Sequence, residues 1–374
     1  MRFNPNPEGG NNERDSRYPY EDMLKSYDKS TYAWQPDMKD KILRVSKSSV
    51  GTFDWCQQQY FLEKILGMRG DEQDYHIRGS NVHDAVEYWW KAMEDVIEDV
   101  WQLVRENKRE QATTLCIEAL PVPPSPYIFG EVEQLHLWVK WQMDRLHTYP
   151  KEVDISTIRR RWFPVGNESE IHATRIVRSS GSGDMSAAEI KQLALDAGAS
   201  AHNVKNRADA EEYLTDLGID FGKGQDVRIH MKGYIDRIFL DDDEAGIVLM
   251  ELKTGKWKDR KRADMRAEMQ FYRMMLEHSQ HMEFLPVSGW GWEFPGGGIN
   301  GGDGPLWDYE SVSGPGGRYA PKTVEKRLQK LVDAHLTGEF TPAPLLKKHD
   351  TFKCEWCDFM HECPFWKVDV NEDS

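Results

Sequence analysis

Apolar side chains recur every three or four positions along much of the chain, which is the spacing of one face of a helix. The first such stretch begins at Ser46, Ser48 and Ser49, residue types that cap helix N-termini, and runs to about residue 66, which places Cys56 within the predicted helix. A longer stretch, from about residue 81 to residue 109, carries a continuous apolar stripe. The same spacing predicts further helices at about 130–148, 262–278 and 322–336.

Short apolar runs predict strands at about 158–177, 226–240, 246–253 and 287–294. The runs YIDRIFL and GIVLMELK flank the acidic segment DDDE, a pattern that predicts a β-hairpin. Residues 179–226 read as two short helices inserted into the sheet, and the glycine-rich segment 295–318 reads as a flexible loop. Together these elements predict an α/β fold with a mixed central β-sheet flanked by helices.

The composition is that of a soluble globular protein, with 39% hydrophobic and 30% charged residues. No apolar run has the length of a membrane span, and the polar N-terminus lacks the apolar core of a secretion signal. We therefore expect a cytoplasmic protein without membrane contact. Residues 1–42 predict a flexible arm, residues 43–366 the folded domain, and residues 367–374 an acidic tail.

The formal net charge of −15 argues against a protein that coats nucleic acid nonspecifically, because neutralising phosphates requires clustered Lys and Arg. Any contact with nucleic acid is expected to be focal. Candidate positions are Arg159–Arg161 and the basic run between Lys256 and Arg266. A solvated charged helix face is the alternative interpretation of both.

The predicted hairpin carries the residues with the clearest chemistry. Asp236 lies on its first strand, and Glu251 and Lys253, two positions apart, point the same way from its second. Mg²⁺ and Mn²⁺ prefer carboxylate oxygens and can activate water to hydrolyse a phosphodiester. Asp236, Glu251 and the Leu252 carbonyl are candidate metal ligands, and His83 could add a nitrogen ligand that favours Mn²⁺. An ordinary hairpin with exposed charges is the alternative.

Four motifs occur in a recognisable order: GS-x-x-HD at 79–84, GYIDRI at 233–238, ELKTG at 251–255 and EMQFYRMMLE at 268–277. This order resembles the PD-(D/E)XK nuclease superfamily, in its RecB-like exonuclease branch, and implies a restriction-endonuclease-like core. The resemblance implies that His83, Asp236 and Glu251 bind metal and that Lys253 is catalytic.

The same resemblance implies that a Q-x-x-x-Y motif supports the site, which assigns Tyr272 this role. Glu268 stands where the family has glutamine, and Gln270 follows two residues later, so either side chain could contact the site.

The chain has five cysteines, three of which form the pattern C-x2-C-x5-C at Cys354, Cys357 and Cys363. Closely spaced thiolates are typical of metal sites, and Cys56 could supply a fourth ligand. The arrangement is similar to that of iron–sulfur RecB-like nucleases, the AddB type and the CRISPR-associated exonucleases, and this implies a [4Fe–4S] cluster. Gln57 departs from that family, which often has proline there. A structural Zn²⁺ site is the alternative, and Cys116 is expected to be buried.

The resemblance implies a metal-dependent DNA exonuclease that acts on single-stranded ends in repair, recombination or CRISPR-type processing. The chain has no helicase Walker motif, so a helicase or a recombination or CRISPR partner would be a separate protein. Two alternatives stay open: a non-catalytic DNA-binding or assembly subunit with the same fold, and an endonuclease of the same fold.

Overall fold

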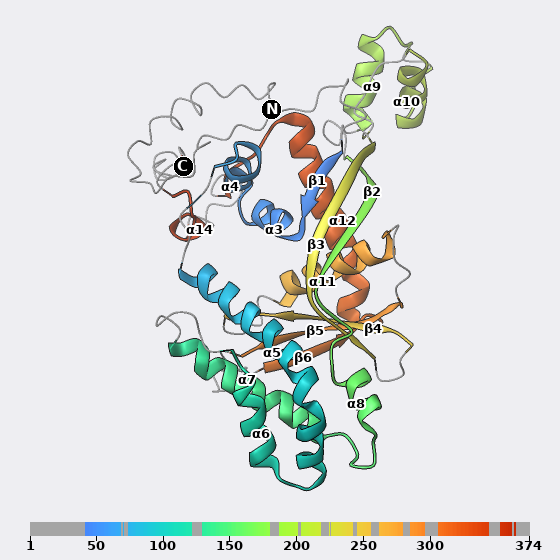
Figure 1. Cartoon of the computed structure of the whole chain (residues 1–374). Helices are drawn as coiled ribbons and strands as arrows, with labels where there is room; N and C mark the ends of the chain where they lie inside the picture. The colour runs from blue at the N-terminus through green and yellow to red at the C-terminus, as the bar shows by residue number, and fades with distance from the viewer. Residues whose placement is uncertain are drawn as a thin grey trace. The chain divides into compact units, whose positions relative to one another are not determined.

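A computed structural model of the chain describes its fold over most of its length (Figure 1). The described residues are 42–68, 70, 74–121, 129–179, 187–200, 203–217, 224, 226–241, 245–255, 262–279, 285–295, 306–343, 352–360 and 363. The predicted arm up to residue 41, the basic positions 256–261 and the acidic tail 367–374 lie outside them. Within the described helices, none combines the length and the apolar composition needed to cross a membrane.

The chain forms two compact units. Unit 1 comprises Met1–Gly70, Thr174–His230 and Glu325–Ser374, and unit 2 comprises Asp71–Ala173 and Met231–Val324. Two strands and one helix run through both sets of residues: β2 (Gly166–Arg178), β3 (Asp226–Leu240) and α12 (Pro315–Thr337).

A mixed sheet connects strands that lie far apart in sequence. Its hydrogen-bonded order is β1-β3-β4-β5-β6, and β2 also pairs with β3. In unit 2, β4 (Ile247–Leu252) is antiparallel to β3 and parallel to β5 (Val287–Phe294), and β6 (Leu306–Ser311) is antiparallel to β5. All six residues of β4 are buried, as expected of a central strand. The predicted α/β fold with a mixed sheet and flanking helices is confirmed.

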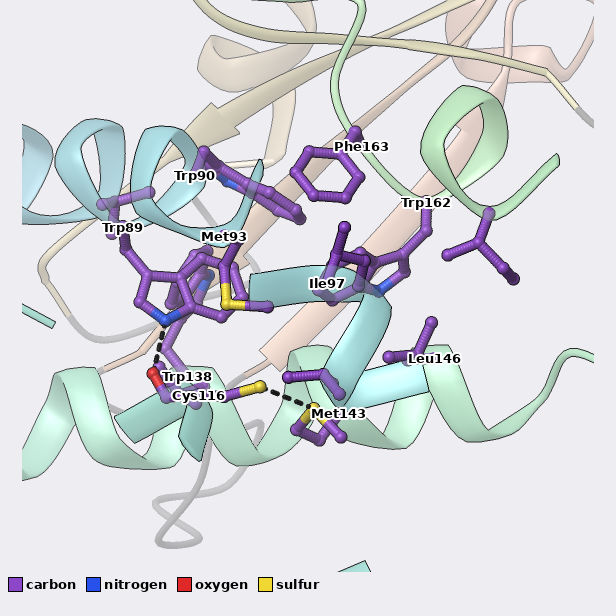
Figure 2. Close-up of a cluster of buried hydrophobic side chains, with 14 of the residues drawn as sticks. Trp89, Trp90, Met93, Ile97, Cys116, Trp138, Met143, Leu146, Trp162 and Phe163 are labelled. Carbon is purple, nitrogen blue, oxygen red and sulfur yellow. Dashed lines mark hydrogen bonds between the residues drawn. The ribbon is translucent and has the colours of Figure 1, made fainter. Parts of the chain in front are cut away.

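The core of unit 2 is built from the helices that precede and follow these strands. They are α5 (Asp74–Arg105), α6 (Arg109–Glu118), α7 (Phe129–His147), α8 (Ile155–Arg161) and α11 (Arg262–Glu277). Figure 1 shows α5, α6 and α7 gathered together, and all three pairs are in contact. A tryptophan cluster fills their interface: Trp89 lies 4.8 Å from Trp138 and 5.9 Å from Trp162, ring centre to ring centre, with edge-to-face geometry (Figure 2).

Cys116 belongs to the same core. It is fully buried, its carbonyl accepts a hydrogen bond from Trp89 Nε1 at 2.7 Å, and its thiol lies 3.2 Å from the sulfur of Met143 (Figure 2). Burial raises the pKa of the Cys116 thiol to about 12, so the thiol stays neutral and packs as a small apolar group. This agrees with the prediction for this cysteine.

Unit 1 contains β1 (Leu43–Ser46), α3 (Lys47–Trp55), α4 (Gln57–Tyr60), a π-helical turn at Phe61–Ile65, α9 (Ala187–Asp196), α10 (Arg207–Asp216) and α14 (Phe352–Glu355). The predicted cap forms at Ser46, whose side chain accepts the Ser49 amide while the Ser49 side chain accepts the Ser46 amide. Tyr60 Oη and His335 Nε2, both buried, lie 2.9 Å apart.

Three predicted elements are wrong. Residues 158–161, predicted to begin a strand, belong instead to the helix α8, because Asp154 accepts the Thr157 amide at 3.0 Å and caps this helix. Cys56 lies between α3 and α4 with extended backbone instead of within one helix. The glycine-rich segment contains β6, which forms because its partner β5 supplies hydrogen bonds that local sequence does not reveal.

Candidate active site

Asp236 and Glu251 lie on facing strands of unit 2. Arg237 pairs with Met250 across β3 and β4, so the same register places Asp236 and Glu251 one residue further along. Both carboxylates are buried, with 6% and 3% of the residue exposed, and Asp236 Oδ2 accepts the Leu252 amide at 2.6 Å. Burial, together with repulsion from Glu251, raises the pKa of Asp236. Two buried carboxylates in such proximity need a cation or a proton to offset their charge.

Lys253 directly follows the last residue of β4, where its backbone is still held by the sheet. Its amide donates to the Glu293 carbonyl on β5 at 2.8 Å. Its ammonium lies 2.9 Å from Glu251 Oε1 and 2.9 Å from Glu268 Oε2 on α11. The carboxylates of Glu251, from β4, and Glu268, from α11, therefore both contact the Lys253 ammonium.

The two candidate side chains on α11 occupy different environments. Glu268 reaches Lys253, whereas Gln270 is buried and its Oε1 has no hydrogen-bond partner among the described residues. The spacing of an α-helix explains this, since residues two apart face different directions. Glu268 is thus the side chain that meets the lysine.

Tyr272 packs where β3 carries a glycine. A Cβ atom at Gly233 would lie 2.9 Å from the Tyr272 ring, so only glycine lets the ring approach this closely. Burial raises the pKa of Tyr272, and the neighbouring Glu251 and Asp236 carboxylates raise it further. Tyr272 therefore remains a neutral phenol that holds α11 against the strand of Asp236.

His83, on α5, faces two carboxylates. Its Nδ1 lies 3.5 Å from Glu168 Oε1 and 3.7 Å from Asp236 Oδ1. Burial acts to lower the pKa of His83, but the hydrogen bond to Glu168 and the charge of Asp236 outweigh it and raise the pKa. Glu168 was not identified from the sequence, because it lies 68 positions before Asp236 in a strand with no recognisable motif.

Glu168 also has an unusual backbone. Its φ is +45°, and Asn107 is the other non-glycine residue with positive φ in the described part of the chain. Asparagine tolerates this region, whereas for glutamate it costs roughly 1–2 kcal/mol. A partly exposed ion pair contributes at most about 1 kcal/mol, so the contact with His83 alone does not offset this strain.

The ligand atoms of His83, Glu168 and Asp236 all lie within 4.8 Å of one another. Ligands of a Mg²⁺ or Mn²⁺ ion at about 2.1 Å are separated by roughly 3 Å when adjacent and 4.2 Å when opposite. One nitrogen and two carboxylate oxygens at this separation fit such a cation. Leu252 takes part through its amide, which donates to Asp236.

A second group of charged side chains, which is buried, includes the residue that follows Asp236 in the chain. Arg237 forms an ion pair with Glu293, and both side chains are almost fully buried. Glu293 also accepts hydrogen bonds from Trp138 Nε1 at 3.0 Å and from Gln142 Nε2 at 3.3 Å, both on α7. The Glu293 side chain therefore holds Arg237, the residue next to Asp236 in the chain. The Glu293 carbonyl holds the backbone amide of Lys253.

The candidate basic positions take part in ion pairs within the protein. Arg159 lies 3.2 Å from Glu98, and both Arg262 and Arg266 pair with Glu310 on β6. These arginines stabilise contacts between elements of unit 2. Their charges are therefore partly offset by carboxylates of the protein itself.

The cysteines of the predicted cluster gather in unit 1. Besides burial, the nearby Cys56 thiol raises the pKa of Cys354 and of Cys357, and the Cys363 thiol raises the pKa of Cys357. Burial is the main cause that raises the pKa of the Cys357 thiol, to about 12. Cys56 Sγ also accepts the Ala343 amide at 3.4 Å. Four cysteines from distant parts of the chain therefore share one neighbourhood.

The family model described as the PD-(D/E)XK nuclease superfamily matches residues 44–364, which include every candidate site residue and all four of these cysteines. No curated protein matches the chain.

Proposed function

Because the chain belongs to the PD-(D/E)XK nuclease superfamily, a family of metal-dependent nucleases, we propose that it is a deoxyribonuclease that digests DNA from single-stranded ends. The observation that carries the nuclease activity is the lysine shared by Glu251 and Glu268 beside the buried Asp236. The preference for single-stranded ends is supported by the order of motifs, which resembles the RecB-like exonuclease branch.

The proposed roles follow from the contacts. His83, Asp236 and Glu251 would hold Mg²⁺ or Mn²⁺, with the Leu252 carbonyl as a further ligand; the bound cation supplies Lewis-acid activation of water and phosphate. Lys253 donates hydrogen bonds to the attacking water or to the phosphate oxygens as negative charge develops. Glu268 positions the Lys253 ammonium, and Tyr272 holds α11, which carries Glu268, against β3.

The direct test compares wild type with D236N and K253M on end-labelled linear single-stranded DNA, with Mg²⁺ or Mn²⁺. Each variant is expected to lose at least about a hundredfold in rate, because transition-state stabilisation by one such group is worth this much. E170Q, at an exposed glutamate of β2, is the control and should cleave normally. Cleavage by D236N at the wild-type rate would exclude the proposed site.

The mode of cleavage is tested with circular DNA. An exonuclease leaves circular single strands intact while it degrades linear ones, and an endonuclease cuts both. DNA binding without cleavage at any cation concentration would instead identify an assembly subunit. An RNA strand of the same sequence tests the choice of DNA, and addition of a separate helicase tests whether duplex DNA becomes a substrate.

We also propose that Cys56, Cys354, Cys357 and Cys363 hold a [4Fe–4S] cluster. The proposal is supported by the mutual electrostatic influence of these thiols on their pKa values, which indicates that they lie near one another, and by the C-x2-C-x5-C spacing, which resembles that of iron–sulfur nucleases. Protein purified without oxygen should be brown, with broad visible absorbance that C357S loses. A colourless sample containing zinc would identify the structural Zn²⁺ site instead.

A further inference from the structure

Glu168 stands at the start of β2, beside the strand that carries Asp236. The Val165 amide donates to the Ile238 carbonyl at 2.7 Å. A Cβ atom at Gly166 would lie 3.2 Å from the Ile238 side chain. These two contacts fix the chain immediately before Glu168 against β3, two residues from Asp236.

Two independent observations distinguish Glu168 from an ordinary surface glutamate. Its carboxylate and that of Asp236 approach the same nitrogen of His83, at 3.5 Å and 3.7 Å. Its backbone has φ of +45°, a conformation that glutamate adopts rarely and that persists where the surroundings impose it. Strained residues of this kind cluster at sites that bind ligands.

The neighbouring Glu170 shows what an ordinary glutamate of this strand does. It is exposed and is satisfied by Lys232 at 2.8 Å, Tyr234 at 2.6 Å and His172 at 2.6 Å. Glu168 instead faces a histidine and a carboxylate, an arrangement that a divalent cation would complete.

We propose that Glu168 is a ligand of the nuclease's divalent cation, together with His83 and Asp236. This rests on the proposed function and adds a ligand to it. The cation site would then combine one nitrogen with carboxylates from β2, β3 and β4. A nitrogen ligand among carboxylates suits Mn²⁺ better than Ca²⁺, which takes oxygen ligands.

The test measures Mn²⁺ binding to the full-length protein by electron paramagnetic resonance of the free ion, without any DNA. Because the chain carries 63 acidic residues, weak sites are defined with D236N and subtracted. E168Q should weaken the specific site about tenfold to hundredfold. E170Q, which removes the same charge two residues away, should bind within about twofold of wild type.

E168G separates a metal ligand from a residue that only supports the fold. Glycine removes the carboxylate and also adopts positive φ without strain. A metal ligand predicts that E168G loses Mn²⁺ affinity while its melting temperature in EDTA equals or exceeds that of wild type. A structural role predicts the reverse: a lower melting temperature with unchanged Mn²⁺ affinity.

The outcomes distinguish this proposal from the one on which it rests. If wild type binds Mn²⁺, D236N does not, and E168Q binds like wild type, then Glu168 is not a ligand and the nuclease site stands without it. If wild type neither binds Mn²⁺ nor cleaves DNA, the proposed function itself fails. Circular dichroism of E168Q and E168G confirms that each variant is folded.

Discussion

The structure shows that Glu268, and not Gln270, contacts Lys253, a choice that the sequence motif alone leaves open. It stands where the resembled family has glutamine, and it lies 2.9 Å from the Lys253 ammonium. A glutamine at this position could also accept a hydrogen bond from the lysine, through its amide oxygen. The essential property is therefore the acceptor and its position, with the charge of secondary importance.

We expect E268Q to retain cleavage within about threefold of wild type, since the acceptor is preserved. E268A should lose about tenfold, because one hydrogen bond to a charged group such as the Lys253 ammonium contributes roughly 1.5 kcal/mol. The measurement is the initial rate on linear DNA with saturating Mn²⁺. E277Q, on the exposed part of α11, serves as the control. Equal rates for E268A and wild type would contradict a positioning role.

His335 gives unit 1 a predicted sensitivity to acid. Burial lowers the pKa of His335 to about 4, whereas an unfolded histidine titrates near 6.5. Between these pH values the unfolded chain binds a proton that the folded chain does not. The stabilisation is complete above about pH 6.5 and is lost as the pH falls toward 4, by about 3 kcal/mol.

H335Q, which keeps an acceptor for the Tyr60 hydroxyl, should show a flatter decline in the free energy of unfolding over this range. Urea unfolding of both proteins at pH 7, 6, 5 and 4 measures the difference. If the two proteins lose stability in parallel, His335 is not the group responsible.

At the scale of elements, β5 links the site to the helical core. Glu293 pairs with the buried Arg237 of β3 and accepts hydrogen bonds from two side chains of α7. Burial lowers the pKa of Arg145, and the charge of Glu293 opposes this effect. One carboxylate therefore offsets the buried guanidinium of Arg237 and the half-buried guanidinium of Arg145. Removing it leaves these cations without their main counter-charge.

We expect E293Q to lower the free energy of unfolding by roughly 3–5 kcal/mol, the usual effect of breaking a buried ion pair. The control is E310Q on β6, which weakens more exposed pairs with Arg262 and Arg266 and should lose about 1 kcal/mol or less. Urea titration at neutral pH compares them. Similar losses in the two variants would show that burial of the Glu293 pair adds nothing.

At the scale of the whole molecule, the chain passes between unit 1 and unit 2 four times, after residues 70, 173, 230 and 324. Neither unit is continuous in sequence, so neither can be isolated by a simple truncation. The helices α9 and α10 differ in this respect. They have a small core of their own, formed by Ile190, Ala194, Val204, Ala210 and Leu214.

The ends of this insertion lie close together. A Cβ atom at Gly224 would lie 1.9 Å from the Ser179 carbonyl. Replacing residues 180–225 by an Asn-Gly turn should therefore let β2 and β3 continue as a hairpin. We expect Mn²⁺ affinity and cleavage within about twofold of wild type, because no site residue lies in the insertion. Loss of Mn²⁺ binding in a folded deletion variant would show that the insertion supports the site.

The sequence by itself determined the fold class and the hairpin, and it predicted most of the candidate site. Asp236, Glu251 and Lys253 could be identified because a hairpin places residues close in sequence close in space. His83 could be identified from its motif. Local periodicity also located most helices, but it assigned residues 158–161 to a strand and missed β6, whose formation depends on a partner strand.

Tertiary structure alone decided which further side chains meet this set. Glu168 joins His83 and Asp236 from a distant strand, Glu268 instead of Gln270 reaches Lys253, and Glu293 carries the buried charge. These contacts depend on the register and direction of elements far apart in the chain. A backbone with φ of +45° at Glu168 likewise has no signature in local sequence, because glutamate adopts this conformation only where the surrounding tertiary structure imposes it.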